Sequence, residues 1–328
     1  MSFRIGVIGS GFAEKHIEAL NQIDEANVVA ICSRNETNAR RICKGNYYAF
    51  DNYLDMLKKE NLDAVYICLP PHLHGDLEKA CSEYVKGLVI EKPVTTTLKQ
   101  GLEILEDFKK AGTIVSVGYM NRYRDNLIKA KTHFAKDPAV LINTAWCGEL
   151  PPPYWWRRRE MSGGQLTEQC THFLDAIRYI SGEFEEVSAF SNSGFIDDVA
   201  DFNVDDSVVM NFKLKNGAIG NAMTSCFSHP HGGGELGLFL NMASRDKTYR
   251  FTEHQMDLEV QYSTGHTEKT LSRENAVLIE NKAFLQALKS GDSSSILSSY
   301  EDSLETLKVS FAADLSIKEK RVIKISEL

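Results

Sequence analysis

The stretch Phe3-Arg4-Ile5-Gly6-Val7-Ile8-Gly9-Ser10-Gly11 decides the fold of the first part of the chain. A short apolar run leads into two glycines, and residues 13–23 then show the apolar spacing of a helix. Glycines in such a turn let the backbone approach an anion closely, and the first turn of the helix offers free N–H groups to it. The stretch therefore predicts a pyrophosphate-binding turn between a strand and a helix.

One feature of the turn departs from the dinucleotide fingerprint. The fingerprint has a third small residue at the place of Glu14, and Ala13 takes that role if the turn is one residue shorter. The alternative interpretation is an ordinary strand-to-helix turn that happens to contain glycines.

Strands and helices alternate through the rest of the first 120 residues. The expected strands are 3–8, 28–32, 64–69, 87–90 and 114–118, and the expected helices are 13–23, 54–59, 73–84 and 98–111. Short apolar strands between helices are typical of a parallel sheet covered on both faces. We expect an α/β fold whose first domain, residues 1–120, is a doubly wound Rossmann sheet.

The pattern changes after residue 120. The expected helices are 121–134, 165–180, 274–289 and 300–318, and the expected strands are 141–148, several within 187–262, and 322–325. The pair Asn216-Gly217 between two apolar runs predicts a β-hairpin. We expect residues 121–328 to form an α+β domain with a large, mostly antiparallel, open-faced sheet.

Composition excludes several classes of protein. The 328 residues carry a net charge of -8, which argues against a nucleic-acid partner. The seven cysteines are scattered without a Cys-x-x-Cys pair, so we expect reduced thiols, a cytoplasmic location and no metal site. No apolar run reaches about 18 residues, and the N-terminus resembles no secretory leader, so we expect no membrane association.

The end of the second expected strand bears on the choice of cofactor. An NAD site usually has an acidic residue there, whereas this chain has Ser33-Arg34-Asn35. Ser33 and Arg34 can donate hydrogen bonds to a 2′-phosphate, which favours NADP. NAD remains the alternative, with Arg34 as a solvated loop residue.

Two further segments follow strands of the first sheet. They are Leu69-Pro70-Pro71-His72-Leu73-His74 and Glu91-Lys92-Pro93. Ligands of open α/β sheets bind at the carboxyl ends of the strands, so we expect both segments to line the cleft. Pro93 restricts Lys92 to an extended conformation, which can aim its ammonium group at the cleft. The alternative is a surface lysine paired with Glu91.

A third segment lies in the expected helix 165–180. Glu168 and His172 are four residues apart and would share a helix face, and Asp175 can fix the tautomer of the His172 ring. A carboxylate and an imidazole on one face suit proton transfer near neutral pH. The alternative is a buried structural histidine.

Together these motifs resemble the Gfo/Idh/MocA family of oxidoreductases. The resemblance rests on Gly9-Ser10-Gly11 with His16, on Leu69-Pro70-Pro71 with His74, on Glu91-Lys92-Pro93, on 118–122, on Gly163-Gly164 with Glu168, His172 and Asp175, and on Asp205-Asp206. It implies that Lys92 lies near the nicotinamide and the substrate, and that His172 is the acid/base. The family often has an aspartate where this chain has Glu168, and a glycine where it has Cys170.

The resemblance also implies the reaction and its contacts. We expect hydride transfer between NAD(P) and a hydroxyl or keto carbon of a sugar, cyclitol or sugar derivative, with Lys92, His172 and Glu168 as catalytic residues. The residues expected to contact the cofactor are Gly9, Ser10, Gly11, Phe12, Ala13, Ser33, Arg34, Leu69, Pro70, Pro71, His74, Glu91, Lys92 and Asn121. The residues expected to contact the substrate are Lys92, Arg122, Tyr154, Trp156, Arg157, Glu168 and His172.

Two other functions fit the same resemblance. They are a dinucleotide-sensing regulatory protein without catalysis, and an enzyme that uses the cofactor without net redox. Whichever function holds, the open face of the second sheet would expose apolar side chains unless it were covered, and the resemblance implies that a second copy covers it. We therefore expect a homodimer or homotetramer.

Overall fold

The computed structural model describes residues 2–226 and 237–328, and the chain divides into two compact units. Unit 1 comprises Met1–Met120 and Asn275–Leu304, and unit 2 comprises Asn121–Glu274 and Glu305–Leu328. The sequence analysis assigned all of 121–328 to the second domain. Residues 275–304 instead pack with unit 1, because a helix in this segment buries apolar side chains against the first sheet.

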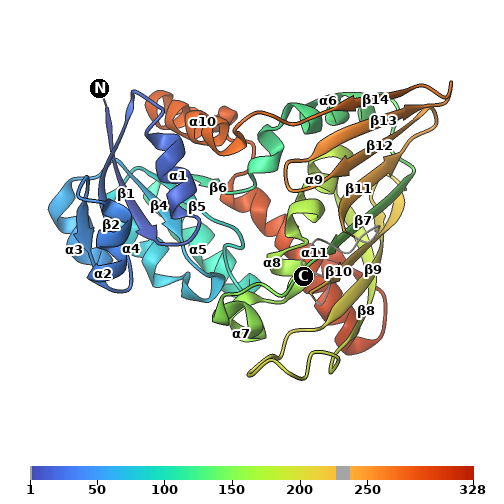
Figure 1. The fold of residues 1–328 in the computed structure, drawn as a ribbon, viewed down its shortest axis with the longest axis horizontal. Coiled ribbons are helices and arrows are strands. Elements are labelled where there is room, and N and C mark those ends of the chain that lie inside the picture. The colour runs from blue at the N-terminus through green and yellow to red at the C-terminus, as the bar shows by residue number, and fades with distance from the viewer. Residues whose placement is uncertain (1, 227–236) are drawn as a thin grey trace. The chain divides into compact units, whose positions relative to one another are not determined.

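The sheet of unit 1 is parallel and six-stranded (Figure 1). Its strands are β1 (Phe3–Gly9), β2 (Ala26–Cys32), β3 (Tyr48–Phe50), β4 (Ala64–Cys68), β5 (Gly87–Ile90) and β6 (Ile114–Val117), in the order β3-β2-β1-β4-β5-β6. The chain runs outward from β1 in one direction and then resumes at β4 in the other. Ligands of such sheets bind at this reversal point, outside the carboxyl ends of the strands. The predicted doubly wound sheet is confirmed.

Six α-helices lie entirely within the described residues of unit 1. They are α1 (Ala13–Leu20), α2 (Glu36–Cys43), α3 (Tyr53–Glu60), α4 (Asp76–Tyr84), α5 (Leu98–Ala111) and α10 (Ala276–Ser290). Figure 1 shows α10 beside α1, and Phe284 of α10 meets Tyr66 of β4 edge to face, with ring centroids 5.8 Å apart. Sequence analysis missed α2 and β3, since α2 is mostly polar and β3 spans only three residues.

Unit 2 is built on a nine-stranded sheet. Its strands are β7 (Leu141–Cys147), β8 (Phe184–Asn192), β9 (Ser207–Leu214), β10 (Ile219–Ser225), β11 (Leu238–Ala243), β12 (Lys247–Thr252), β13 (Asp257–Tyr262), β14 (Thr267–Thr270) and β15 (Ile323–Lys324). All paired neighbours are antiparallel except β7 and β10. The hairpin predicted at Asn216-Gly217 joins β9 to β10, and Gly217 supplies the positive φ of 93° that its turn requires.

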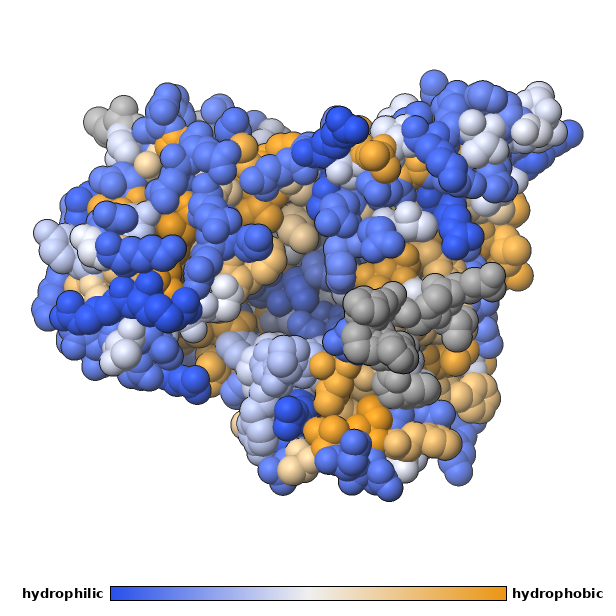
Figure 2. Space-filling model, viewed as in Figure 1, coloured by the Kyte–Doolittle hydropathy of each residue, from blue (hydrophilic) through white to orange (hydrophobic). Residues whose placement is uncertain are grey.

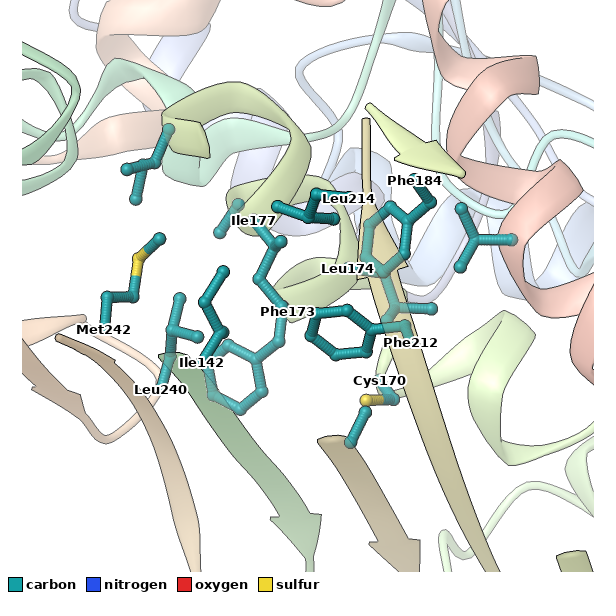
Figure 3. Packing of buried hydrophobic residues seen from close by; sticks show 14 of the residues in the cluster. Ile142, Cys170, Phe173, Leu174, Ile177, Phe184, Phe212, Leu214, Leu240 and Met242 are labelled. Atoms are coloured by element: carbon teal, nitrogen blue, oxygen red, sulfur yellow. The ribbon is translucent and has the colours of Figure 1, made fainter. Parts of the chain in front are cut away.

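Helices cover one face of this sheet. They are α6 (Asp125–Phe134), the short α7 (Arg159–Ser162) and α8 (Gln165–Glu168), α9 (Thr171–Ser181) and α11 (Tyr300–Glu319), whose first residues belong to unit 1. Figure 3 shows the core between α9 and the strands, where Phe173 and Ile177 lie with Ile142, Leu240 and Met242. Neighbouring strand residues such as Leu141 and Ile219 point to the opposite face and are more than half exposed.

Candidate functional site

Three loops leave adjacent strands at the carboxyl edge of the unit 1 sheet. Gly9 at the end of β1 pairs in register with Cys68 at the end of β4. The backbone N–H of Glu91, just after β5, donates to the carbonyl of Ile67 at 2.8 Å. The glycine turn, the Leu69–His74 segment and the Glu91-Lys92-Pro93 turn thus start side by side, although 82 residues separate Gly9 from Glu91.

The glycine turn fits a dinucleotide. Gly9 has a φ of +121°, and a Cβ there would lie 2.1 Å from the carbonyl oxygen of Cys68, so only glycine suits this position. Among the described residues, its chain neighbours apart, none lies within 4 Å of a Cβ built on Gly11, which leaves open space beside the loop. Phe12 precedes α1 without a side-chain cap, so the first amides of the helix are not capped by a side chain at that position. Such a helix start binds a pyrophosphate.

Ala13 is the first residue of α1 and is fully buried. This is the small-residue contact that the shortened turn requires, and it lets α1 start close to the sheet.

The loop after β2 contains the residues expected to meet the adenosine end. Ser33 is buried, and its backbone N–H donates to the carbonyl of Phe50 at 3.0 Å. Arg34 is exposed. Asn35 caps α2 by accepting from the N–H of Asn38 at 2.9 Å. Asn35 therefore has a capping role at the start of α2, which an aspartate could fill as well.

The segment Leu69–His74 is held together by its own histidine. His74 is buried, and its Nδ1 lies against the carboxylate of Glu78 while its Nε2 is 3.3 Å from the carbonyl oxygen of Leu69. Pro70 and Pro71 introduce a 3₁₀ turn, Pro71–Leu73, before α4. The ring of His74 therefore fixes the shape of the loop from inside, and helix 73–84 of the sequence analysis is a 3₁₀ turn followed by α4.

Glu91 faces inward while Lys92 begins the next turn. The Oε1 of Glu91 lies 2.9 Å from the Nε2 of the buried His16 on α1. The side chain of Lys92 is half-buried. Glu91 thus belongs to a buried polar contact with the helix that starts at the glycine turn.

In unit 2, the helix expected at 165–180 is broken. It consists of α8, which ends at Glu168, and α9, which begins at Thr171. The single helix predicted over 165–180 is therefore not found: Glu168 ends one helix, and His172 lies in the first turn of the next. The break contains Cys170, whose burial raises the pKa of its thiol to about 12, so that this sulfur is neutral and a poor nucleophile at neutral pH.

Glu168 and His172 each have an aromatic neighbour. The carboxylate of Glu168 accepts a hydrogen bond from the Nε1 of Trp156 at 2.8 Å. The ring of His172 stacks on Trp146 of β7, with centroids 5.7 Å apart and planes inclined by 22°. His254 meets the same indole edge to face at 5.1 Å. Sequence analysis missed Trp146 and His254, because a tryptophan within a strand and a turn histidine give no local signal of a site.

Asp175, which was predicted to orient the ring of His172, accepts hydrogen bonds from Arg122 and Thr306. Its two carboxylate oxygens accept hydrogen bonds from the Nη2 and Nε of Arg122, at 2.6 and 2.9 Å, and one of them also accepts from Thr306 at 3.0 Å. Both partners are buried, and Arg122 is only 4% exposed. The structure thus places Arg122 in an internal ion pair, where sequence analysis expected a substrate contact. Asn121 is also buried, and its Oδ1 accepts from the Nε of Arg124 at 2.9 Å.

The segment 154–157 shows mixed exposure. Tyr154 is 52% exposed and its hydroxyl donates to Asp201 at 3.3 Å, whereas Trp156 is buried with Val204 and Cys226. The Nε of Arg157 is buried and has no hydrogen-bond partner among the residues that the structure describes. Of the expected aromatic substrate wall, Tyr154 is open to a ligand and Trp156 is packed inside.

Neither a membrane-spanning helix nor a metal-binding cluster occurs in the described part of the chain, 2–226 and 237–328. No helix there is long and apolar enough to cross a membrane. No group of three histidine, cysteine, aspartate or glutamate side chains in those ranges is arranged to hold a metal ion.

Comparisons with known proteins agree with this architecture. Residues 3–119 match the family described as "Oxidoreductase family, NAD-binding Rossmann fold", and residues 138–241 match the "GFO/IDH/MocA C-terminal domain". Myo-inositol 2-dehydrogenase of Thermotoga maritima is 30% identical, with 99% of each chain covered.

Solved structures give the same result for the fold. A probable dehydrogenase from Thermotoga maritima superposes with a TM-score of 0.78 at 26% identity, covering 99% of both chains. Levoglucosan dehydrogenase in complex with NADH and levoglucosan superposes with a TM-score of 0.87 at 18% identity, also covering 99% of both chains, which supports the fold alone. This chain belongs to the Gfo/Idh/MocA family of oxidoreductases and carries its NAD-binding Rossmann domain.

Proposed function

We propose that the protein transfers a hydride between a nicotinamide cofactor and a hydroxyl or keto carbon of a sugar, cyclitol or sugar derivative. The observation that carries the proposal is the position of Lys92, which follows β5 at the sheet edge where the glycine turn and the Leu69–His74 segment also start. The full-length similarity to a myo-inositol 2-dehydrogenase supports a polyhydroxylated substrate.

The side chains divide the chemistry between them. When bound, the nicotinamide supplies or accepts the hydride. The ammonium group of Lys92 donates a hydrogen bond to the reacting oxygen and stabilises the negative charge that develops on it. His172 removes the hydroxyl proton during oxidation and returns it during reduction.

Glu168 and the segment before it complete the substrate side of the proposal. The hydrogen bond from the indole of Trp156 fixes the orientation of the Glu168 carboxylate, which then accepts hydrogen bonds from substrate hydroxyl groups. Arg157 and Tyr154 donate to more distant oxygens of the substrate. Trp156 acts through Glu168 and not as an exposed wall.

We propose NADP as the preferred cofactor. The loop after β2 offers the hydroxyl of Ser33 and the exposed guanidinium of Arg34, and it contains no carboxylate at positions 33–35 that would repel a 2′-phosphate. The buried thiols fit the reducing environment of the cytoplasm, the location that we propose for the protein.

The proposed function is tested by incubating the pure protein with NADP⁺ or NAD⁺ and a panel containing myo-inositol and common sugars. Turnover is followed through the absorbance of the reduced nicotinamide. We expect Lys92→Ala and His172→Ala to lower kcat by about a hundredfold or more. Lys86→Ala, at the other end of β5, and His266→Ala, in an exposed turn, are the matched controls. Binding of NADPH without turnover of any substrate would instead indicate a sensor.

We also propose that a second copy covers the open face of the unit 2 sheet. This face carries the exposed apolar side chains Leu141, Val209 and Ile219, and Figure 2 shows apolar patches among the hydrophilic residues of the molecular surface. An apolar sheet face of this kind is typical of an interface between subunits. Light scattering is expected to give a dimer or tetramer that Ile219→Lys dissociates, whereas a monomeric wild type would contradict this assignment.

A further inference from the structure

Three buried polar side chains connect the helix after the glycine turn to the residue before Lys92. His16 of α1 is fully buried, and its Nε2 lies 2.9 Å from the Oε1 of Glu91. Its Nδ1 lies 3.1 Å from the Oδ1 of Asn281, which is itself fully buried on α10. A buried polar group costs free energy unless it is hydrogen-bonded, so each of these contacts constrains its partner.

The neighbouring atoms leave this cluster little room. The ring of His16 meets Phe12 and Tyr66 edge to face, with centroids 5.6 and 5.2 Å apart. On its other side, the carboxylate of Glu91 fills the space beside Gly118, where an added Cβ would lie 2.5 Å from Oε1 and 2.8 Å from Oε2. The carboxylate of Glu91 therefore lies between the imidazole of His16 and the backbone of Gly118, where a side chain would not fit.

The cluster joins two parts of the proposed cofactor site. His16 lies one turn after Ala13, where α1 begins, and Glu91 is joined to Lys92 by a peptide bond. We propose that His16, Glu91 and Asn281 are positioning residues that hold Lys92 in register with the start of α1. This assignment rests on the proposed role of Lys92, and it goes further by giving Glu91 and His16 a function in which neither touches the substrate.

The donors and acceptors around His16 indicate which of its ring nitrogens carries a proton. The Nδ2 of Asn281 has no hydrogen-bond partner among the residues described, while its Oδ1 faces a ring nitrogen. Rotating the amide by half a turn brings Nδ2 to the Nδ1 of His16, which satisfies that buried donor. His16 is then neutral, with Nδ1 accepting from Asn281 and the Nε2–H donating to Glu91.

Because the Nε2–H of the neutral His16 ring donates to the side chain at position 91, two variants at this position should behave differently. Glu91→Gln keeps an oxygen that accepts from the Nε2–H of His16, whereas Glu91→Ala removes the acceptor and leaves a cavity beside Gly118. We expect Glu91→Ala to lower kcat by at least about tenfold and Glu91→Gln by less than about threefold, because misplacing a catalytic group by about 1 Å costs up to a hundredfold. The Kd for NADPH, measured by fluorescence, should change by a smaller factor than kcat in Glu91→Ala, since the effect acts through Lys92 and the glycine turn is not altered.

A second readout does not depend on finding the substrate. Reductive methylation with an isotope-labelled reagent gives each lysine an NMR signal, and Lys92→Arg identifies the signal of Lys92. We expect NADPH to shift this signal in the wild type, in Glu91→Gln and in the buried control Ser116→Ala, and to leave it broadened or unshifted in Glu91→Ala. If Glu91→Ala does not fold, Glu91→Asp replaces it, because its shorter side chain draws the carboxylate away from His16. The same response of the Lys92 signal is expected.

The tautomer of His16 is read from the ring nitrogen signals of histidine-labelled apoprotein, with His16→Gln to assign them. A ring protonated on both nitrogens would overturn the neutral assignment. Equal behaviour of Glu91→Ala and Ser116→Ala in kcat and in the Lys92 signal would overturn the positioning role. If no substrate in the panel turns over but the Lys92 signal responds as expected, the proposed reaction fails while the positioning role stands.

Discussion

The imidazole of His172 lies nearly parallel to the indole of Trp146, with ring centroids 5.7 Å apart. Trp146 comes from the middle of the unit 2 sheet, and His172 from the first turn of α9. The indole therefore limits the rotation of the imidazole and presents it in one orientation, which a proton-transferring group requires.

The stacking predicts the effect of truncating Trp146. Trp146→Ala should lower kcat by about tenfold with a smaller change in KM, because the ring of His172 loses its stacking partner. Trp146→Phe retains a ring and should lose less than about threefold. Steady-state kinetics with the best substrate of the panel measure both values, and equal losses in the two variants would show that stacking is not what orients His172.

The buried pair Arg122–Asp175 predicts a large change in stability. Asp175→Ala leaves a guanidinium buried without its carboxylate, so we expect the free energy of unfolding to fall by about 3–5 kcal/mol. Urea denaturation followed by circular dichroism measures this change. In the exposed pair Arg40–Glu36, Glu36→Ala should change the same quantity by less than about 0.5 kcal/mol. A similarly small loss in Asp175→Ala would mean that solvent reaches the guanidinium.

The two glycines of the first turn should respond differently to alanine. Gly9→Ala places a Cβ against the carbonyl of Cys68, so both stability and NADPH binding should fall, the former by about 1–3 kcal/mol. The Cβ of Gly11→Ala meets no atom of the described residues within 4 Å, its neighbours in the chain apart, so the fold should be kept. If the pyrophosphate occupies that open space, the affinity for NADPH falls while the stability is unchanged. Thermal unfolding and NADPH fluorescence separate the effects, and full affinity in Gly11→Ala would move the pyrophosphate elsewhere.

Arg34 predicts the preference between the two nicotinamide cofactors. Arg34→Ala should weaken NADPH binding by about tenfold or more, because a hydrogen bond between charged groups is lost. NADH lacks the 2′-phosphate, so its Kd should change by less than about threefold. Arg40→Ala, which removes an exposed arginine of α2, is the control in fluorescence titrations. Equal losses for both cofactors would assign Arg34 to adenine or to the loop itself.

Asp314 predicts a dependence of stability on pH. Desolvation raises the pKa of its carboxyl to about 6, and the nearby Arg159 opposes the shift. Because the native pKa lies above the unfolded value, the neutral form is favoured in the folded state, and this contribution is lost as pH rises through about 6. Asp314→Asn should therefore gain stability relative to the wild type between about pH 4 and 7.

The Asp314 effect should be modest. About a third of the side chain is exposed, so solvent screening keeps the expected difference to on the order of 1 kcal/mol. Thermal unfolding across the pH range gives the difference, with Asp302→Asn as a control on the same helix. A gain for Asp314→Asn that is the same at all pH values would indicate a change unrelated to this titration.

The sequence predicts those parts of the site that depend on local geometry. Gly9 marks a turn because only glycine fits there, and Lys92 can be placed at the sheet edge because strands and helices alternate. Trp146 could not be found in this way, since the pairing and packing of β7 bring it to His172 from 26 residues away in the chain. The break after Glu168 also lacks a signal, because neither glycine nor proline stands at Gln169-Cys170.

The pairing of Asp175 with Arg122 was not predicted, for a related reason. Spacing within one segment suggested His172, whereas the fold supplies Arg122, which lies 53 residues earlier. Local spacing says which side chains share a helix face, but competition from distant charged groups decides which of them pair.

The return of residues 275–304 to unit 1 has a consequence for biosynthesis and for protein engineering. The ribosome must complete nearly the whole polypeptide before Phe284 can reach Tyr66 and Asn281 can reach His16. A fragment that stops at Met120 would expose the apolar surface that α10 covers and leave the imidazole of His16 without its amide. Unit 1 therefore cannot be separated as one continuous piece of the chain. A chimera that exchanges unit 1 between relatives must carry both of its segments, Met1–Met120 and Asn275–Leu304.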